Sequence, residues 1–195
     1  MKGEQTRQRI LDSATELFWA RNYHGVSVAD VAEVASVNKA TLYQYFQSKD
    51  VLVQSVVSSS REWTVEHIFD SAFADSKDPM IRLRCIYKRV HVFHQCIFES
   101  HNEVRGCPFV NIAMELAVDN ELVRMQVVKT FEQFSEYYRT IVRDYRGKRI
   151  AKTKVDRLVR ALLGNMNGAM VASRYERRPD AILDALPIAE LLVKS

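Results

Sequence analysis

The stretch ASVNKATLYQYFQSK carries many side chains that can form hydrogen bonds. If it forms a helix, Leu42 and Phe46 lie four residues apart on one face and turn toward a core. Lys39, Ala40 and Thr41 then stand at the start of that helix, away from the apolar face. A helix that reads the major groove needs small or hydrogen-bonding side chains at this point, so that it can reach base edges. The pattern therefore predicts contact with DNA bases.

Three further residues of this stretch suit contacts to the DNA backbone. The hydroxyls of Tyr43 and Tyr45 can donate hydrogen bonds to phosphate oxygens. Lys49 opens the next helix, where an ammonium group adds to backbone N–H groups that favour anions. A small helical bundle without DNA-binding function is the alternative, because helical spacing alone does not exclude it.

Helical periodicity supplies the elements that must position these residues. Residues 6–21 repeat apolar side chains at helical spacing, and Ser27 followed by Asp30 is typical of a helix N-cap. Asn38 is an N-cap for a third helix over 39–47, and Ser48 caps a longer fourth helix. Three short helices with a three-residue break at 36–38 predict a helix-turn-helix.

The composition favours an all-α protein that stays in the cytoplasm. Of 195 residues, 47% are hydrophobic and 27% charged, with six Gly and four Pro, which suits a helical core. No apolar run reaches the length of a membrane span, and the start of the chain has no signal-peptide pattern. The net charge is +4, but residues 1–50 hold six basic and six acidic residues, so DNA binding must depend on where the charges lie.

Further helices are expected over about 80–100, from Pro108 to about 145, and over 154–175, with a basic connector at 146–154. Pro179 opens a helix in the tail and Pro187 restarts it. The three cysteines show no CxxC or zinc spacing, and the pair His91 and His94 lacks a third ligand. We therefore expect no metal and no cofactor, and no motif indicates an enzyme.

The segment SVADVAEVASVNKATLYQYFQSKDVL resembles the DNA-binding signature of the TetR/AcrR family of bacterial transcriptional regulators. The match covers residues 10–52, and GCPFVNIAMELA is similar to a segment seen in many members. The resemblance implies a helix-turn-helix domain at 1–50 and a larger helical domain for effector binding and dimerisation at 51–195. It gives a DNA-backbone role to Ser27, Tyr43, Tyr45 and Lys49, and a base-reading role to Lys39, Ala40 and Thr41.

Two positions depart from the family pattern. Ser36 stands where the family often has a glycine, which tolerates a left-handed turn best. Asn38 replaces a common serine. Neither residue should break the motif, but the operator sequence cannot be carried over from a relative.

The helix over 154–175 carries a stripe of small residues, and the tail after it is apolar. Glycine inside a helix costs about 1 kcal/mol, so a glycine stripe suggests close approach of another helix. The two segments resemble the family's dimerisation face, unless they bury only against the protein's own helices. The expected interface residues are Ala161, Gly164, Gly168, Ala172, Leu183, Leu186 and Leu191.

An effector pocket is implied by the resemblance alone. Its candidates are large or polar residues on the inward sides of the later helices, and core packing is the alternative for each. These residues are Trp63, Phe69, Tyr87, His94, Met114, Phe131, Tyr138 and Met166.

Cys107 follows Arg105 and Gly106 and precedes Pro108 at an expected helix start. Helix N-termini and nearby cations stabilise a thiolate, so we expect Cys107 to be the most reactive thiol, with a buried packing residue as the alternative.

The whole pattern predicts a dimeric repressor that binds a palindromic operator and leaves it when a small molecule binds. A ligand-independent architectural DNA-binding protein is the alternative.

Overall fold

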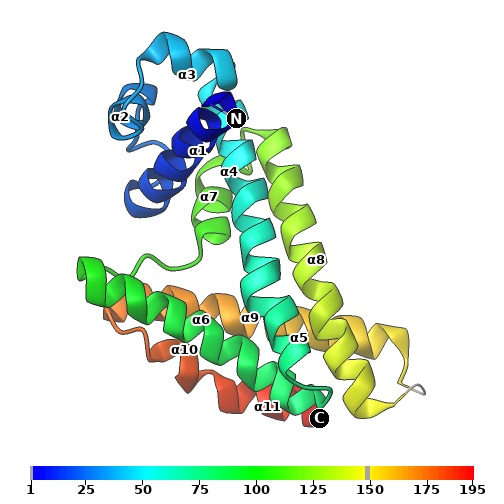
Figure 1. Ribbon diagram of the computed structural model, residues 1–195. Coiled ribbons are helices and arrows are strands. Elements are labelled where there is room, and N and C mark those ends of the chain that lie inside the picture. Colours follow the sequence, from blue (N-terminus) through cyan, green and yellow to red (C-terminus); the bar gives the residue numbers. More distant parts are fainter. Residues whose placement is uncertain (1, 148–149) are drawn as a thin grey trace. The chain divides into compact units, whose positions relative to one another are not determined.

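The computed structural model describes residues 2–147 and 150–195, and every element in these ranges is a helix (Figure 1). Lys148 and Arg149 of the predicted basic connector lie outside the described residues. The elements are α1 (Lys2–Arg21), α2 (Val28–Val34), α3 (Lys39–Tyr45), α4 (Lys49–Thr64), η1 (Val65–Asp70), α5 (Ser71–Asp75), α6 (Pro79–His101), α7 (Pro108–Leu116), α8 (Glu121–Arg146), α9 (Lys152–Glu176), α10 (Ala181–Asp184) and α11 (Leu186–Lys194). The expected all-α class is confirmed.

The chain forms two compact units. The first unit comprises Met1–Glu62 and Pro108–Thr130, and the second comprises Trp63–Cys107 and Phe131–Ser195. This division differs from the expected one at residue 50, because α7 and the first part of α8 pack with the N-terminal helices. The long helices α4 and α8 each contain residues of both units.

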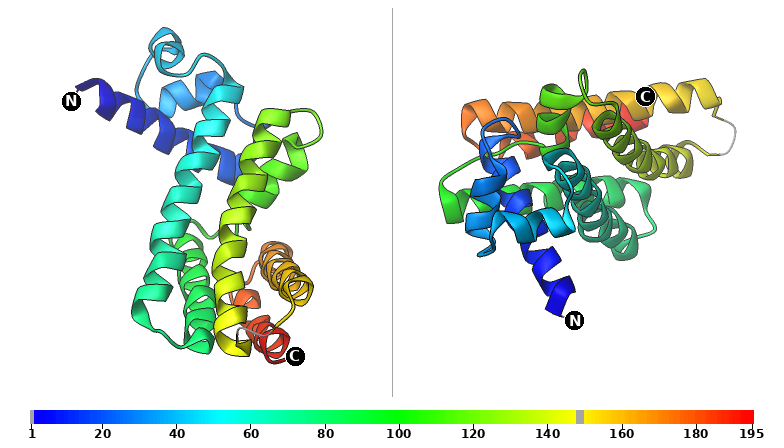
Figure 2. Two further views of the ribbon diagram at one scale, coloured as in Figure 1. Left: turned by 90° about the vertical axis from the view of Figure 1, so that its right-hand side faces the viewer. Right: turned by 90° about the horizontal axis from the view of Figure 1, so that it is seen from above.

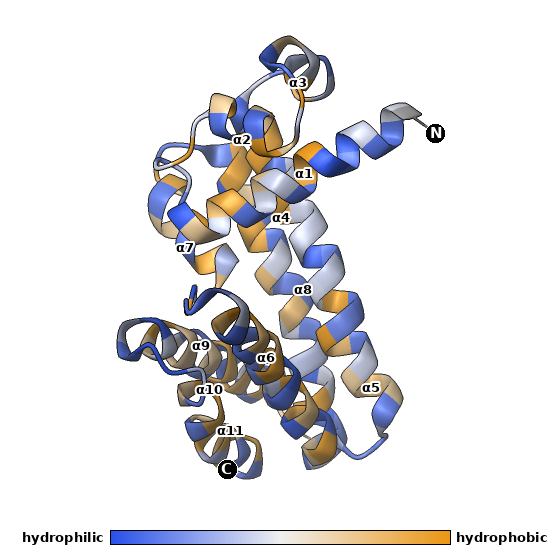
Figure 3. Ribbon diagram, turned by 60° about the vertical axis from the view of Figure 1, so that its left-hand side comes forward, coloured by the Kyte–Doolittle hydropathy of each residue, from blue (hydrophilic) through white to orange (hydrophobic). Residues whose placement is uncertain are grey.

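Apolar side chains at helical spacing form the core of the first unit. Ile10, Ala14 and Phe18 of α1 are all buried, as the periodicity predicts. Leu42 of α3 and Phe46 directly after it are also buried, which confirms the predicted inner face of the third helix. Figure 3 shows apolar and polar stretches alternating along α1.

Side-chain caps set the boundaries of the short helices. Ser27 and Asp30 form a reciprocal capping box at the start of α2. Asn38 Oδ1 accepts a hydrogen bond from the Thr41 N–H at 2.7 Å, and Ser48 Oγ accepts one from the Val51 N–H at 3.1 Å. The expected N-caps are therefore confirmed.

The turn between α2 and α3 contains a residue in the left-handed region. Ser36 has φ 53°, where an L-residue with a side chain is strained. The glycine that the family often has there is thus replaced without loss of the turn. The neighbouring N–H groups of Ser36 and Val37 still donate to the carbonyls of Glu33 and Ala32.

Helices α6, α9, α10 and α11 pack together in the second unit, with α10 and α11 along α9 (Figures 1 and 2). Tyr87 of α6 is fully buried and donates its hydroxyl to Asn165 Oδ1 of α9 at 2.6 Å. His91 Nε2 lies 2.8 Å from the carboxylate of Asp180, just before α10. Polar contacts therefore hold α6 to α9 and to the segment just before α10.

The fourth helix does not continue as a regular α-helix. Val65–Asp70 form a π-helical segment, and the Ser71 N–H donates to the carbonyl of Glu66, five residues earlier. One residue is inserted into the helix here, which shifts the faces of all following residues. Apolar periodicity does not reveal such an insertion in advance.

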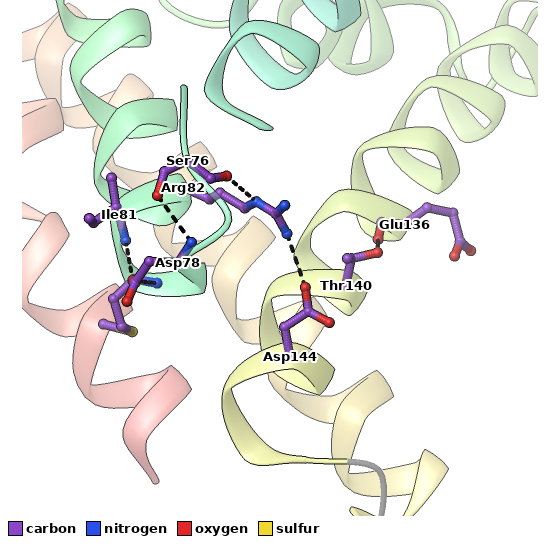
Figure 4. A network of polar contacts seen from close by, with 8 residues as sticks. Ser76, Asp78, Ile81, Arg82, Glu136, Thr140 and Asp144 are labelled. Atoms are coloured by element: carbon purple, nitrogen blue, oxygen red, sulfur yellow. Dashed lines mark hydrogen bonds and ion pairs between the residues drawn. The ribbon is translucent and has the colours of Figure 1, made fainter. Parts of the chain in front are cut away.

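A polar network holds the start of α6 to the end of α8 (Figure 4). Asp78 caps α6 by accepting hydrogen bonds from the N–H groups of Met80 and Ile81. Arg82 donates to the Ser76 carbonyl at 2.7 Å and to Asp144 Oδ2 at 3.0 Å.

Within residues 2–147 and 150–195, no helix is both long and apolar enough to cross a membrane.

Candidate DNA-binding interface

Helix α3 presents its polar side to solvent. Lys39 and Ala40 are exposed, and Thr41 is half-buried. The buried Leu42 shows that the opposite side of the helix is anchored in the core. The three residues expected to read bases thus lie together on the first turn of a well-anchored helix.

The two tyrosines of α3 differ in their surroundings. Tyr43 is 47% exposed. Tyr45 is half-buried, and its hydroxyl lies close to Gly3 near the start of α1. Tyr43 is therefore the more accessible donor for a phosphate oxygen.

Ser27 is exposed and stands at the positive end of α2. Its Oγ accepts a hydrogen bond from the Asp30 N–H at 3.2 Å. The hydroxyl proton remains available for donation, because the cap uses only a lone pair. The nearby Asp30 carboxylate keeps a pKa below its usual range through its hydrogen bonds with Ser27.

Lys49 has a different environment from the one that its position suggests. Its ammonium nitrogen donates to the Tyr23 carbonyl at 2.6 Å and lies 3.7 Å from the centroid of the Tyr23 ring. The side chain is half-buried, so its charge points into the first unit. Burial lowers the pKa of Lys49, while Glu115, Asp50 and Asp30 oppose this effect.

Three residues around Lys49 were not predicted from the sequence. The Tyr23 hydroxyl donates to Asp50 Oδ1 at 2.5 Å, and the Glu115 carboxylate accepts from the N–H groups of Tyr23 and His24. Burial, followed by the bond to Asp50, raises the pKa of Tyr23. Lys49, Asp50 and Glu115 therefore all form hydrogen bonds with Tyr23. No local motif marks Glu115, which lies 92 residues from Tyr23.

Two known protein families match the sequence of this chain. The pattern of the bacterial regulatory proteins of the tetR family matches residues 10–56, which include α2, α3 and the start of α4. The pattern of the tetracyclin repressor-like C-terminal domain matches residues 79–188, more than half of the chain. The chain belongs to the TetR family. TetR-family members are transcriptional regulators, so α3 is the recognition helix of a DNA-binding protein.

Individual TetR-family proteins resemble this chain over much of its length. The transcriptional repressor DhaR of Mycobacterium sp. (strain GP1) is 24% identical over 178 residues, covering 90% of this chain and 86% of its own. The regulator TtgR of Pseudomonas putida is 28% identical over 122 residues, covering 59% of this chain and 57% of its own.

Solved structures show the same fold. The TetR-family regulator SCO4454 from Streptomyces coelicolor has a TM-score of 0.83 at 22% identity, covering 98% of this chain and 95% of its own. A TetR-family regulator from Agrobacterium tumefaciens has a TM-score of 0.82 at 21% identity, covering 96% and 97%. At these identities the likeness concerns the fold alone.

In this TetR-family chain, the predicted dimerisation stripe lies on the outside of α9. Gly164 and Gly168 are exposed, and a Cβ atom at either position would meet no other atom within 4 Å. An open hollow of about 400 Å³ runs along this stripe and is bounded partly by α10. It is lined by Gly164, Asn165, Gly168, Ala169, Ala172, Glu176, Arg178, Ala181, Asp184 and Ala185.

The other predicted interface residues vary in exposure. Leu191 is 59% exposed, whereas Leu183, Leu186 and Ala161 are half-buried. The alternative that the stripe buries only against the protein's own helices does not describe Gly164 and Gly168. Their faces remain open in the single chain.

Some of the predicted pocket residues come together in the second unit. Phe69 contacts Phe134, Tyr137 and Tyr138, with ring centroids 4.8–5.9 Å apart, and Phe131 contacts Phe134. Trp63 is 39% exposed and stacks on His67, with ring centroids 4.6 Å apart. Three further candidates are buried in the same unit: Tyr87, His94 and Met166.

The burial of two side chains bears on the expectations for Met114 and Cys107. Met114 was expected to point inward, but its side chain is 81% exposed, because its neighbours Ile112 and Leu116 supply the buried face of α7. Cys107 was expected to be the most reactive thiol, with a buried packing residue as the alternative; it is only 6% exposed, whereas Cys96 is exposed and Cys85 is half-buried, which favours the alternative. The residue before a helix start can face the core, and here the Cys107 thiol does.

Proposed function

We propose that this TetR-family protein is a homodimeric repressor that binds a palindromic operator and is released by a small-molecule effector. The main support for operator binding is the recognition helix, in which Leu42 is fully buried while Lys39 and Ala40 are exposed. A helix anchored in this way can enter the major groove without loss of its packing. Repression is supported by the relative DhaR, which is itself a repressor.

Base reading is assigned to Lys39, Ala40 and Thr41. Lys39 offers an ammonium donor, Thr41 a hydroxyl and Ala40 a methyl group that suits a thymine methyl. Backbone contacts are assigned to Ser27, Tyr43 and Tyr45, whose hydroxyls can donate to phosphates. For Lys49 the backbone N–H groups at the start of α4 remain the candidate phosphate donors, because the ammonium is bonded to Tyr23.

Dimerisation is proposed through the stripe on α9 together with α11. Close helix contact requires small residues, and Gly164, Gly168 and Ala172 leave room for a second copy. Exposed apolar side chains of Val171, Ile188 and Leu191 would be removed from water on association. Two copies related by a two-fold axis would present two recognition helices to a palindrome.

The effector site is proposed in the second unit, where aromatic rings are concentrated. Phe69, Phe131 and Tyr138 belong to one cluster, and Trp63 is partly exposed beside His67. Such rings favour an effector with planar apolar parts. The alternative, a ligand-independent architectural protein, predicts that no small molecule changes DNA binding.

Sequencing of genomic DNA fragments that the protein retains from its source genome tests operator binding. One palindromic motif should be enriched, and Thr41→Ala should reduce that enrichment. Fragments without a shared motif would instead favour the architectural alternative.

Effector binding is tested separately by fluorescence in a Trp19→Phe variant, which leaves Trp63 as the single tryptophan. Compounds that quench Trp63 are then tested for release of the selected DNA. If no compound that binds releases DNA, the effector proposal fails, even when an operator exists.

A further inference from the structure

One carboxylate of α7 holds two consecutive backbone amides at the end of α1. Glu115 Oε2 accepts from the His24 N–H at 2.9 Å, and Oε1 accepts from the Tyr23 N–H at 3.3 Å. These amides directly follow Asn22, whose φ of 62° turns the chain away from α1. Charge-assisted bonds of this kind are stronger than neutral ones.

The same turn is held from the start of α4. Lys49 donates to the Tyr23 carbonyl at 2.6 Å, and the Tyr23 hydroxyl donates to Asp50 at 2.5 Å. The side chain of Tyr23 is 8% exposed and packs 5.6 Å from the Phe18 ring, between centroids. Residues from α7 and α4 thus meet on the N–H, the carbonyl and the hydroxyl of a single tyrosine.

This turn is where the chain enters the helix-turn-helix. Helix α2 begins at Val28, and α3 follows it after the Ser36 turn. Since α1 contacts both α2 and α3, the conformation of the turn bears on where the recognition helix lies.

We propose that Glu115 is a positioning residue for DNA binding, which sets the place of the helix-turn-helix on α1 by holding the Tyr23 and His24 amides. The inference rests on the proposed operator binding. It assigns to α7, far from the recognition helix in sequence, an indirect part in DNA affinity, through the turn after α1. The ammonium of Lys49 serves the same turn.

The first test is the Glu115→Gln variant. An amide side chain has one acceptor oxygen, and its NH₂ group would face a backbone N–H donor, so at least one of the two bonds is lost. We expect the Tyr23 and His24 amides to exchange with solvent about tenfold faster, as measured by NMR on the full chain. Operator affinity should fall about tenfold, with the salt dependence unchanged because no phosphate contact is removed.

Glu121→Gln is the matched control. Glu121 lies in the same unit, is exposed, and pairs with Arg124 on its own helix. It changes the net charge by the same amount, which by itself favours binding to phosphate. We expect this variant to retain wild-type amide exchange and an operator affinity equal to or slightly above that of the wild type.

Glu115→Asp adds a second variant that keeps the charge but shortens the side chain by one methylene. It should behave like Glu115→Gln, because reach and not charge is lost. The proposal is overturned if amide exchange is unchanged in Glu115→Gln, or if operator affinity falls no more than in Glu121→Gln. Faster exchange with full affinity would likewise remove the positioning role.

A variant that fails to fold does not end the test. In the wild-type protein, a coupling across the hydrogen bond between the His24 amide nitrogen and the Glu115 carboxylate carbon should be detectable by NMR. Absence of that coupling in a well-resolved spectrum would overturn the proposal without any substitution. Because exchange and coupling are measured without DNA, their outcome does not depend on whether an operator is found.

Discussion

The ammonium nitrogen of Lys49 lies 2.6 Å from the carbonyl oxygen of Tyr23 and 3.7 Å from the centroid of its ring. A lysine at the start of a helix that follows a recognition helix is expected to meet a phosphate. Here the cation instead closes the turn after α1, with a hydrogen bond and a cation–π contact. The consequences for stability and for salt dependence can be separated by experiment.

Lys49→Met should destabilise the protein by about 1–2 kcal/mol, because it removes a charge-assisted hydrogen bond at a half-buried site. Chemical denaturation measures this, and Lys77→Met, at an exposed lysine of the second unit, should have almost no effect. The salt slope of operator binding should stay the same. A slope reduced by about one would instead identify a phosphate contact by the Lys49 ammonium.

Thr41→Ala should lower discrimination between operator and unrelated DNA by about 1–3 kcal/mol, since a hydrogen bond to a base edge is lost. Competition binding with both duplexes at one salt concentration measures the difference. Thr140→Ala is the control, because Thr140 is an exposed helical threonine of the second unit. Equal losses for operator and unrelated DNA would show that Thr41 does not read a base.

Gly168→Leu should have two opposite effects. The single chain gains about 0.8–1 kcal/mol of helix stability, because the new side chain meets open space. The dimer should dissociate, since the leucine fills the hollow that the second copy would occupy. Sedimentation at micromolar concentration measures the assembly, and a variant that remains a full dimer would place the interface elsewhere.

His94 should make the protein less stable in mild acid. Burial, helped by the nearby His91, lowers the pKa of His94 from 6.5 to about 4. Above pH 6.5 the ring is neutral whether folded or unfolded. As the pH falls from 6.5 to 4, only the unfolded chain takes up the proton, so stability is lost by up to about 3 kcal/mol.

Urea denaturation from pH 7 to pH 4 measures this loss. His94→Gln should remove that part of the pH dependence, whatever its effect on stability at pH 7. The exposed His101 provides the control His101→Gln, which should keep the wild-type slope. An unaltered slope in His94→Gln would show that His94 takes up its proton equally in both states.

The cysteines should react in the order of their exposure, with Cys96 fastest, then Cys85, and Cys107 slowest. Access limits alkylation when a thiol is buried, even at a helix start. Mass spectrometry after brief alkylation of the native protein at neutral pH measures the three rates. If Cys107 reacts first, the thiolate expectation from its sequence setting is restored.

The helical class and the short N-terminal helices can be predicted from local sequence patterns. Leu42 and Phe46, four residues apart, predicted the buried side of α3, and Ser27 and Asn38 predicted where α2 and α3 begin. These features depend on side chains within one turn of each other. Local periodicity and helix capping depend on residues that are close in sequence, so both can be predicted without knowledge of the fold.

The partners of the charged residues near the interface follow from contacts between distant segments. Glu115 accepts a hydrogen bond from the Tyr23 N–H across 92 positions of the chain, and the Lys49 ammonium donates to the Tyr23 carbonyl across 26. The burial of Cys107 and the exposure of Met114 likewise depend on tertiary packing. The partners of a charge, and the side of a helix that is covered, follow from packing between distant segments, which local spacing does not encode.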